Sequence, residues 1–370
     1  MEKQIIGVDA SRSNSTQKTG TEYYSYELIR NLAKFDDAFF RLYSKEPLDY
    51  LPKSDHCENK VMQFPRLWSQ IRLSWEIFQN PPAVLFEPAH TIPLYHGKKT
   101  VVTLHDLGFK HFPELYTPLE RIYHSFCMDF STRHATKIIA ISQATKKDLI
   151  DIYHVDEKKI EVIYHGFDRD KFYPAQKPAG EKIKALMPYI FFIGRLEAKK
   201  NIVNLIKSYG LLRQNDQIKE KLVLAGRPGY LYEDIKKEID ALPAKIRQDV
   251  IELGYVPDEE VGDLSRYASV FAFPSRFEGF GMPLLEEMAC GVPVVASNTT
   301  SIPEIVGEAG LLSDPDDAEK FSYNLEQAIT NIDLRKKIIE KGLKRSAEFS
   351  WEKCARETLD LILSVANKNS

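Results

Sequence analysis

The sequence predicts an α/β protein of two doubly wound domains that face a cleft, each with a parallel sheet between layers of helices. The chain has 370 residues, which is more than one hydrophobic core usually organises. Short apolar runs alternate with helical patterns along its length, as is typical of parallel sheets. At 165–185 this pattern stops in a stretch with two prolines, two glycines and many charges, and then it starts again.

The first half begins with an apolar strand at 5–9. Gly20 lies where a helix is expected to open, and this helix should run to about Lys34. Ser142, a favoured N-cap residue, is expected to begin another helix. Further apolar runs predict strands at 84–87, 99–104, 137–141 and 161–164. With the break that follows, these elements predict a first domain at 1–175.

The second half repeats the alternation as if from a new N-terminus. Its apolar runs predict strands at 189–193, 221–225, 250–253, 270–274 and 292–297, with helices at 201–213 and 259–267. The second domain is therefore expected at 186–350, and the cleft at the carboxyl ends of both sets of strands. A last helix begins at Trp351, and the segment 351–370 is expected to cross back onto the first domain.

Composition narrows the function classes. A formal net charge of −3 gives no reason to expect a nucleic acid as partner. The four cysteines are scattered, so free thiols in a reducing compartment are expected. There is no signal-peptide layout and no apolar run near the roughly 18 residues of a membrane span. The sequence thus predicts a cytoplasmic protein, with peripheral contact at the inner face of a membrane as an option.

The stretch 276–297, RFEGFGMPLLEEMACGVPVVAS, is the most informative part of the chain. Glu278 and Glu286 have seven residues between them, including two glycines and Pro283. The glycines allow a tight turn, and proline suits the first turn of a helix. The N-terminus of such a helix offers free N–H groups and a partial positive charge to a phosphate. With a carboxylate on either side, the stretch predicts a clamp for a sugar phosphate.

A basic pair follows the first strand of the second domain. Arg195 comes directly after Gly194, and Lys200 lies five residues further on at a helix start. Arginine offers a rigid fork and lysine a mobile point charge, so the pair suits a diphosphate. Two solvated surface cations are the alternative interpretation. Because the pair lies at a strand end in the same domain as Glu278, one shared crevice is favoured.

Together these segments resemble the large retaining glycosyltransferase family 4. The resemblance rests on the 276–297 stretch, on GRLEAKKN at 194–201 and on HGFDRDKFYP at 165–174, and it covers nearly the whole chain. It implies the GT-B architecture, in which two Rossmann-like domains face a cleft. It also implies that a nucleotide-activated sugar binds mainly to the second domain and the acceptor mainly to the first.

The resemblance assigns roles to single residues. Arg195 and Lys200 would hold the donor diphosphate, Glu278 would bind hydroxyls of the donor sugar, and Glu286 would bind the ribose. In the first domain His105, which ends a strand, would contact the donor sugar. His105, Arg195, Lys200 and Glu278 are therefore the candidate catalytic residues. A packing role at the strand end is the alternative for His105.

The remaining expected donor-binding positions lie in three turns. The loop 254–257 resembles the one around the nucleobase, and Gly20 resembles part of a glycine-rich loop near the transferred sugar. Asp106 is expected either to orient His105 or to bind the acceptor. Besides Glu286, the donor-binding set is Gly20, Val256, Phe280, Gly281, Met282 and Leu284.

Two details of the resemblance indicate which donor and which mechanism to expect. The first loop has one glycine where the family commonly has two, and TLHDLGF at 103–109 is similar to the branch of bacterial polysaccharide mannosyltransferases. This favours GDP-mannose, with a UDP-sugar as the other option. The expected reaction is transfer of a hexose, with retained anomeric configuration and without a metal or other cofactor, to a glycan or a lipid-linked saccharide. Glu278 is interpreted as a sugar anchor, with a covalent nucleophile as the open alternative.

A helix with large apolar residues is the candidate membrane contact. It is expected either to pack on the first sheet or to lie in an anionic membrane surface, where Trp and Arg are suited. The apolar residues predicted to share one helical face are Leu67, Trp68, Ile71, Trp75 and Phe78, with Arg66 and Arg72 nearby.

Two other functions compete with glycosyl transfer. A nucleotide-sugar epimerase on the same architecture would convert the donor without an acceptor. A catalytically inactive sugar-nucleotide-binding protein would be expected to lack Arg195, Lys200 or Glu278, and all three are present.

Overall fold

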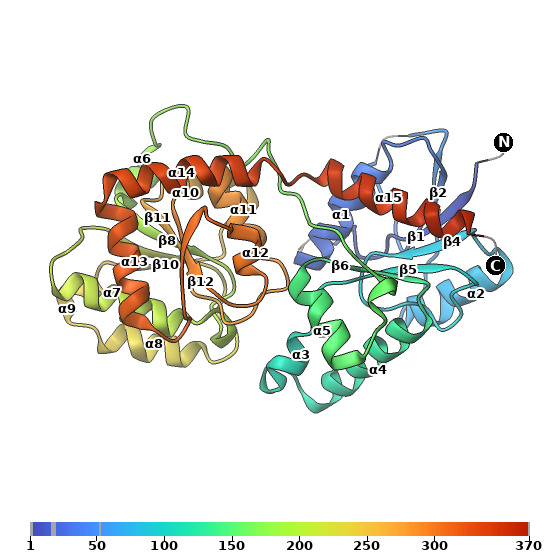
Figure 1. The fold of residues 1–370 in the computed structure, drawn as a ribbon, viewed down its shortest axis with the longest axis horizontal. Helices are drawn as coiled ribbons and strands as arrows, with labels where there is room; N and C mark the ends of the chain where they lie inside the picture. The colour runs from blue at the N-terminus through green and yellow to red at the C-terminus, as the bar shows by residue number, and fades with distance from the viewer. Residues whose placement is uncertain (1–2, 16–19, 52, 369–370) are drawn as a thin grey trace. The chain divides into compact units, whose positions relative to one another are not determined.

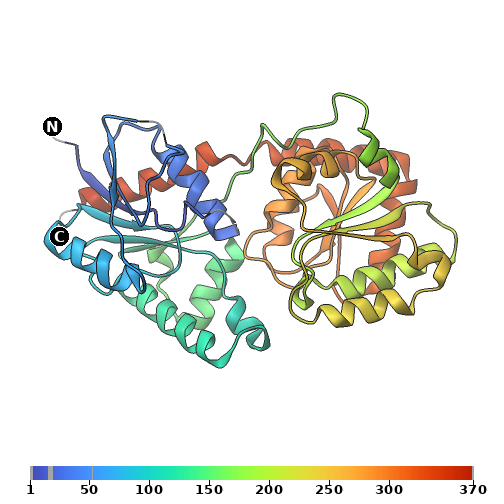
Figure 2. The same ribbon diagram turned by 180° about the vertical axis from the view of Figure 1, so that it is seen from behind.

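The computed structural model describes residues 3–15, 20–51 and 53–368, and the chain divides into two compact units. Unit 1 comprises Met1–Gly166 with Ser350–Ser370, and unit 2 comprises Phe167–Phe349. Each unit contains one sheet in which every paired strand runs parallel to its neighbour, with helices on both faces (Figures 1 and 2). The predicted α/β class with two doubly wound domains is confirmed.

The sheet of unit 1 has the strand order β3-β2-β1-β4-β5-β6-β7. Its central strands are buried on both faces, which is why they read as continuous apolar runs. The strands at 5–9 and 84–87 have the predicted bounds, whereas β2 and β3 were missed. The strands are β1 Ile5–Asp9, β2 Phe39–Ser44, β3 Cys57–Val61, β4 Val84–Glu87, β5 Thr100–Leu104, β6 Lys137–Ala140 and β7 Ile160–Val162.

Local sequence signals set the helix starts of unit 1. Thr117 and Glu120 form a capping box at the start of α4, and Ser142 caps α5 by accepting a hydrogen bond from the Thr145 N–H. In Figures 1 and 2, α1 and α15 cover one face of the sheet, while α4 and α5 cover the other. The helices are α1 Gly20–Leu32, α2 Ser74–Gln79, α3 Gly108–His111, α4 Pro118–His134, α5 Gln143–Tyr153 and α15 Trp351–Asn367.

Helix α15 completes unit 1 from the far end of the chain. It packs against α1 and β4, and its buried face includes Leu359 and Ile362. The two places where the chain passes between units touch each other, since a Cβ on Gly166 would lie 2.0 Å from the backbone nitrogen of Trp351. The chain therefore leaves unit 1 and returns to it at neighbouring points.

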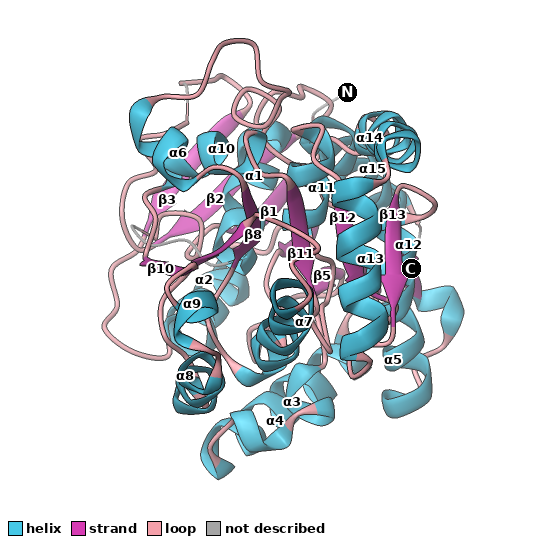
Figure 3. Cartoon of the chain, turned by 90° about the vertical axis from the view of Figure 1, so that its left-hand side faces the viewer, coloured by secondary structure: helices cyan, strands magenta, loops and turns pink. Residues whose placement is uncertain are grey.

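The sheet of unit 2 has the strand order β10-β9-β8-β11-β12-β13. Helices α7 and α13 stand in front of its strands in Figure 3 and share one apolar core with them. The strands are β8 Tyr189–Ile193, β9 Lys221–Ala225, β10 Val250–Gly254, β11 Val270–Phe273, β12 Val294–Ser297 and β13 Gly310–Ser313. The helices are α6 Glu181–Leu186, α7 Ile202–Gln214, α8 Tyr232–Ala241, α9 Ala244–Arg247, α10 Asp258–Arg266, α11 Met282–Ala289, α12 Ile302–Val306, α13 Ala318–Thr330 and α14 Ile332–Ser346.

The described ranges contain no helix with both the length and the apolar character needed to span a bilayer.

Candidate active site

The candidate residues of unit 2 gather at the switch point of its sheet. From β8 the chain continues outward to β9 and β10, and it returns beside β8 only at β11. In open parallel sheets, ligands bind at the carboxyl ends of the strands where the order reverses in this way. Arg195 follows β8 and Glu278 follows β11, so the topology brings these two segments to neighbouring strand ends.

Lys200 and Glu278 form an ion pair at this edge. The Lys200 Nζ lies 2.6 Å from the Glu278 Oε1, and the two side chains are only 16% and 12% exposed. Asn201, in the left-handed region with φ 56°, ends the short helical turn that carries Lys200, and its side-chain amide donates to the Pro315 carbonyl. The pair, largely shielded from solvent, thus brings together a cation and a carboxylate, the types of group that bind phosphates and hydroxyls.

The turn between Glu278 and α11 is built as the sequence predicted. Gly281 has φ +97°, a conformation that favours glycine, and Pro283 lies in the first turn of the helix. The Ser301 hydroxyl fixes the turn by donating to the Glu278 and Phe280 carbonyls, at 3.0 and 2.9 Å. The turn is therefore held rigidly in front of the helix N-terminus.

The four predicted residues of this turn contribute differently. Phe280 and Leu284 have buried side chains, so their side chains belong to the core. The Leu284 N–H already donates to the Gly281 carbonyl at 3.0 Å. Met282 is the first residue of α11, directly after Gly281. The structure thus places all four together in one turn, and it engages the Leu284 N–H within that turn.

Two adjacent glutamates on α11 have perturbed acidity. Burial raises the pKa of Glu286 to about 7, while the nearby Lys171 lowers it and Asp258 and Asp168 raise it further. Burial also raises the pKa of Glu287 to about 8. The Ser265 hydroxyl donates to the Glu287 Oε1 at 2.6 Å, and the Oε2 has no hydrogen-bond partner among the described residues. Sequence reasoning missed Glu287, whose only signal is its place among the apolar residues of the helix.

Arg195 is positioned by two loops that bond to each other. The Leu196 N–H donates to the Arg227 carbonyl and the Gly229 N–H donates to the Leu196 carbonyl, both at 2.9 Å. A Cβ on Gly229 would lie 2.7 Å from the Arg195 Cγ, so the arginine stem lies against this glycine. Gly226 has φ +151°, and a Cβ there would lie 1.8 Å from the Gly194 carbonyl oxygen. The loops after β8 and β9 therefore form one close-packed unit.

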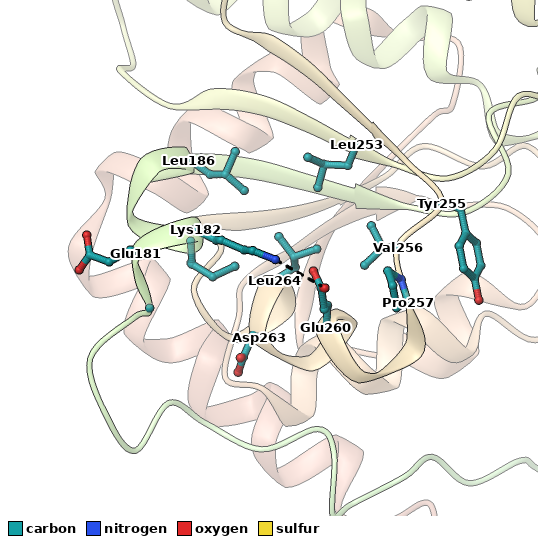
Figure 4. A pocket seen from close by; sticks show the side chains of 12 residues that line it. Glu181, Lys182, Leu186, Leu253, Tyr255, Val256, Pro257, Glu260, Asp263 and Leu264 are labelled. Atoms are coloured by element: carbon teal, nitrogen blue, oxygen red, sulfur yellow. Dashed lines mark ion pairs between the residues drawn. The ribbon is translucent and has the colours of Figure 1, made fainter.

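The loop that holds Val256 borders a cavity of about 580 Å³ between α6 and α10. Its walls are largely apolar, and the Lys182 Nζ and Glu260 Oε1 lie 3.9 Å apart across it (Figure 4). Val256, which follows the end of β10 at Gly254, therefore lines this cavity.

In unit 1 His105 is buried directly after β5. Its Nε2–H donates to the Pro88 carbonyl at 2.8 Å, which leaves Nδ1 as an acceptor. Burial lowers the pKa of His105 to about 4, so the ring is neutral near pH 7. Helix α1, which begins at Gly20, brings the Tyr24 ring against His105 with 4.7 Å between centroids. Asp106 accepts a hydrogen bond from the Gly108 N–H at 2.8 Å.

A buried carboxyl pair at the ends of β1 and β4 was not predicted. Glu87 is 1% exposed, its Oε1 has no hydrogen-bond partner among the described residues, and its pKa is raised well above the usual value by burial and by Asp9. Asp9 accepts from the Ser11 N–H and the Ser69 hydroxyl. Burial and the neighbouring Asp9 therefore both favour the protonated form of Glu87.

The prediction of one apolar face shared by Leu67, Trp68, Ile71, Trp75 and Phe78 is wrong for Trp68. Trp68 is buried and donates to the Met62 carbonyl, whereas Leu67, Ile71, Trp75 and Phe78 are between 49% and 61% exposed. Leu67, in the left-handed region with φ 52°, and the N-cap residue Trp68 both precede the π-helical turn Ser69–Leu73. Four large apolar side chains are therefore exposed on one segment of unit 1.

Across 3–15, 20–51 and 53–368, no group of three or more His, Cys, Asp and Glu side chains is arranged to hold a metal ion.

Comparisons with known proteins agree with the architecture. Residues 19–171 match the model of the family described as Glycosyltransferase Family 4, and residues 176–345 match that of Glycosyl transferases group 1. O-antigen chain mannosyltransferase B from Escherichia coli is 29% identical over 371 residues, which cover 92% of this chain and 95% of that protein.

Solved structures are similar over almost the whole length. Sucrose-phosphate synthase from Thermosynechococcus elongatus has a TM-score of 0.74 at 18% identity, covering 98% of this chain and 99% of that one. Alr3699/HepE from Anabaena in complex with UDP-glucose has a TM-score of 0.71 at 19% identity, covering 98% and 100%. At this level of identity the likeness establishes the fold.

Proposed function

The chain belongs to the GT-B glycosyltransferases, with a family 4 part followed by a group 1 part, and from this premise we propose that it transfers mannose from GDP-mannose to a glycan or a lipid-linked saccharide. The observation that carries the proposal is the Lys200–Glu278 pair beside the rigid turn of α11. Mannose is favoured because an O-antigen mannosyltransferase is similar over almost the full chain.

The proposed chemistry is departure of a nucleoside diphosphate with retention of configuration at the sugar. Arg195, Lys200 and the N-terminus of α11 stabilise the charge that grows on the leaving diphosphate. These cations and dipoles supply the stabilisation without a metal ion. Glu278 anchors the sugar hydroxyls, Glu286 holds the ribose, and His105 is the proposed catalytic residue of unit 1. Asp106 was expected either to orient His105 or to bind the acceptor. The Nε2–H of His105 already donates to the Pro88 carbonyl and does not need Asp106 to orient it, so we propose that Asp106 binds the acceptor.

The direct test is transfer from GDP-mannose by Lys200→Ala and Glu278→Ala. Each variant is expected to lose about 10²- to 10³-fold in kcat, the usual effect of removing one charge-stabilising group. Lys207→Ala is the matched control, since Lys207 is a half-exposed lysine on α7 with a 4.0 Å ion pair to Glu238. Near-normal transfer by both active-site variants would refute the site assignment. Formation of an epimer from the donor alone would instead identify an epimerase.

We also propose cytoplasmic location with peripheral attachment at an anionic membrane surface. Arg66 and Arg72 belong to the same segment as the exposed apolar side chains of 67–78, and Arg72 also pairs with the buried Glu76 at 3.4 Å. The two acidic residues between 63 and 99, Glu76 and Glu87, are both buried. Exposed apolar groups with basic neighbours suit the headgroup region of anionic lipids.

Vesicle sedimentation tests the attachment. The wild type is expected to sediment with phosphatidylglycerol vesicles and much less with phosphatidylcholine vesicles, because the basic neighbours need anionic lipid. Trp75→Ser with Phe78→Ser should abolish sedimentation. Ile332→Ser, which removes an equally exposed apolar side chain from unit 2, should not. Equal sedimentation of all three proteins would contradict the proposed surface.

A further inference from the structure

Arg227 and Tyr255 form an exposed pair at the carboxyl ends of β9 and β10. The Arg227 Cζ lies 4.5 Å from the centroid of the Tyr255 ring, and the tyrosine is 58% exposed. Among the described residues, the Tyr255 ring is the only side-chain partner of this guanidinium, which makes no hydrogen bond or ion pair with them. An arginine has five N–H donors in a fixed fork, and here they are available to a ligand.

The strand order sets the distance between this pair and the proposed diphosphate site. Arg195, Arg227 and Tyr255 follow β8, β9 and β10, which are consecutive neighbours in the sheet. Neighbouring strands are about 4.8 Å apart, so the end of β10 lies roughly 10 Å from that of β8. A nucleoside whose diphosphate sits at Arg195 would extend over a distance of this order.

The three loops are also fixed relative to each other. The Gly226 N–H donates to the Gly254 carbonyl at 2.7 Å, and the Leu196 N–H donates to the Arg227 carbonyl at 2.9 Å. The backbone therefore presents Arg227 and Tyr255 at a constant spacing from Arg195.

We propose that Arg227 and Tyr255 select guanine as the base of the donor. The proposal rests on the proposed transfer function, because it concerns the nucleotide of the same site. Tyr255 stacks on the base, and Arg227 donates two parallel hydrogen bonds to O6 and N7 of guanine. Guanine presents two acceptors on this edge, whereas adenine presents a donor beside N7 and uracil has no N7.

Binding of the base would move Arg227 from the Tyr255 ring to the edge of the base, and this exchange is energetically favourable. An exposed cation–π contact is weaker than stacking of a base on an aromatic ring, so the base can take the place of the guanidinium on Tyr255. Since the Arg227 side chain has no other partner in the described part of the chain, it can then move to the edge of the base. Stacking is tolerant of base identity, so discrimination comes from the arginine and general affinity from the tyrosine.

The cavity between α6 and α10, which Tyr255 also lines, is the competing place for the base. Its floor includes Leu186 and Leu253, and its polar groups Lys182 and Glu260 pair with each other (Figure 4). A base there would find few partners for its polar edge. Leu186 lines this cavity and Arg227 does not, so a bulkier side chain in Leu186→Trp separates the two assignments.

Calorimetric titration with GDP, UDP, ADP and inorganic pyrophosphate tests the proposal. Arg227→Met should weaken GDP binding about 5- to 150-fold, the effect of one bidentate base contact, and change UDP binding by less than about threefold. Tyr255→Leu should weaken all three nucleotides and leave pyrophosphate unchanged, while Tyr255→Phe and Leu186→Trp should bind GDP like the wild type.

Each contrary result has its own meaning. An unchanged GDP-to-UDP ratio in Arg227→Met, a wild type that prefers UDP, or loss of GDP binding in Leu186→Trp alone would overturn the base assignment. Transfer from GDP-mannose by the wild type would still support the proposed function in the first and third cases. A wild type that neither binds nucleotides nor transfers mannose refutes the proposed function itself.

Discussion

Donor binding is expected to depend on the charge of Glu286. Burial raises the pKa of this carboxyl to about 7, with opposing effects of Lys171 on one side and of Asp258 and Asp168 on the other. As the proposed holder of the ribose hydroxyls, Glu286 must accept hydrogen bonds, and the ionised form does so best. The donor should therefore bind the ionised form.

The size of the effect follows from this pKa. With a value of about 7, roughly one tenth of Glu286 is ionised at pH 6 and roughly nine tenths at pH 8. The Kd for GDP-mannose should accordingly be about tenfold weaker at pH 6 than at pH 8, which is about 1.4 kcal/mol. Affinity rises with pH because the ionised form of the acid binds the ligand.

Calorimetric titration with GDP-mannose at the two pH values is the assay. The intact donor is preferable to GDP, whose terminal phosphate itself titrates near pH 6. Glu286→Gln should bind more weakly and without the pH dependence. Glu287→Gln should keep the dependence, because Glu287 bonds to Ser265 and is not proposed to touch the donor. A flat wild-type profile, or an unchanged slope in Glu286→Gln, would refute the reasoning.

Two further outcomes concern stability. Because burial raises the pKa of Glu87 well above its usual value, its contribution to stability is fully present below the unfolded pKa of about 4.3 and is lost as pH rises toward the folded pKa. Glu87→Gln should thus be more stable than the wild type at pH 7 but not at pH 4, as urea unfolding at both values would show; lower stability at both would contradict this. Gly226→Ala should cost about 3 kcal/mol or more, because its Cβ would overlap the Gly194 carbonyl. Gly180→Ala, with open space around its Cβ, should unfold at the wild-type urea concentration, and equal midpoints for both variants would refute the packing argument.

The strands that the sequence predicted best are those buried on both faces. The runs at 189–193 and 221–225 became β8 and β9 with the predicted bounds, because continuous apolar residues admit few alternatives. By contrast β3, CENKV, is a partly exposed edge strand, and β13 is only four residues long. Neither has an apolar pattern strong enough to distinguish it from a loop.

The sequence predicted which residues belong to the candidate site, but it did not predict the contacts between them. Lys200 and Glu278 stand in separate motifs, and their ion pair exists only because β8 and β11 are neighbours at the switch point. The raised pKa values of Glu287 and Glu87 follow from their burial in the tertiary structure, and the presence of a glutamate in the sequence does not reveal whether it is buried. Likewise, the helical periodicity assumed for 67–78 could not show that Leu67 and Trp68 precede the π-helical turn.

Unit 2 is an insertion within unit 1, because the chain leaves unit 1 after Gly166 and returns to it at Ser350. The close approach of Gly166 and Trp351 shows that the two ends of the insertion meet. During synthesis the sheet of unit 1 emerges first, but α15, whose Leu359 and Ile362 complete its core, emerges only after the whole of unit 2. Since domains generally fold as units while the chain grows, unit 2 can close on its own before unit 1 has its last helix. Unit 1, whose sheet is synthesised before unit 2, is thus the unit that completes its folding last.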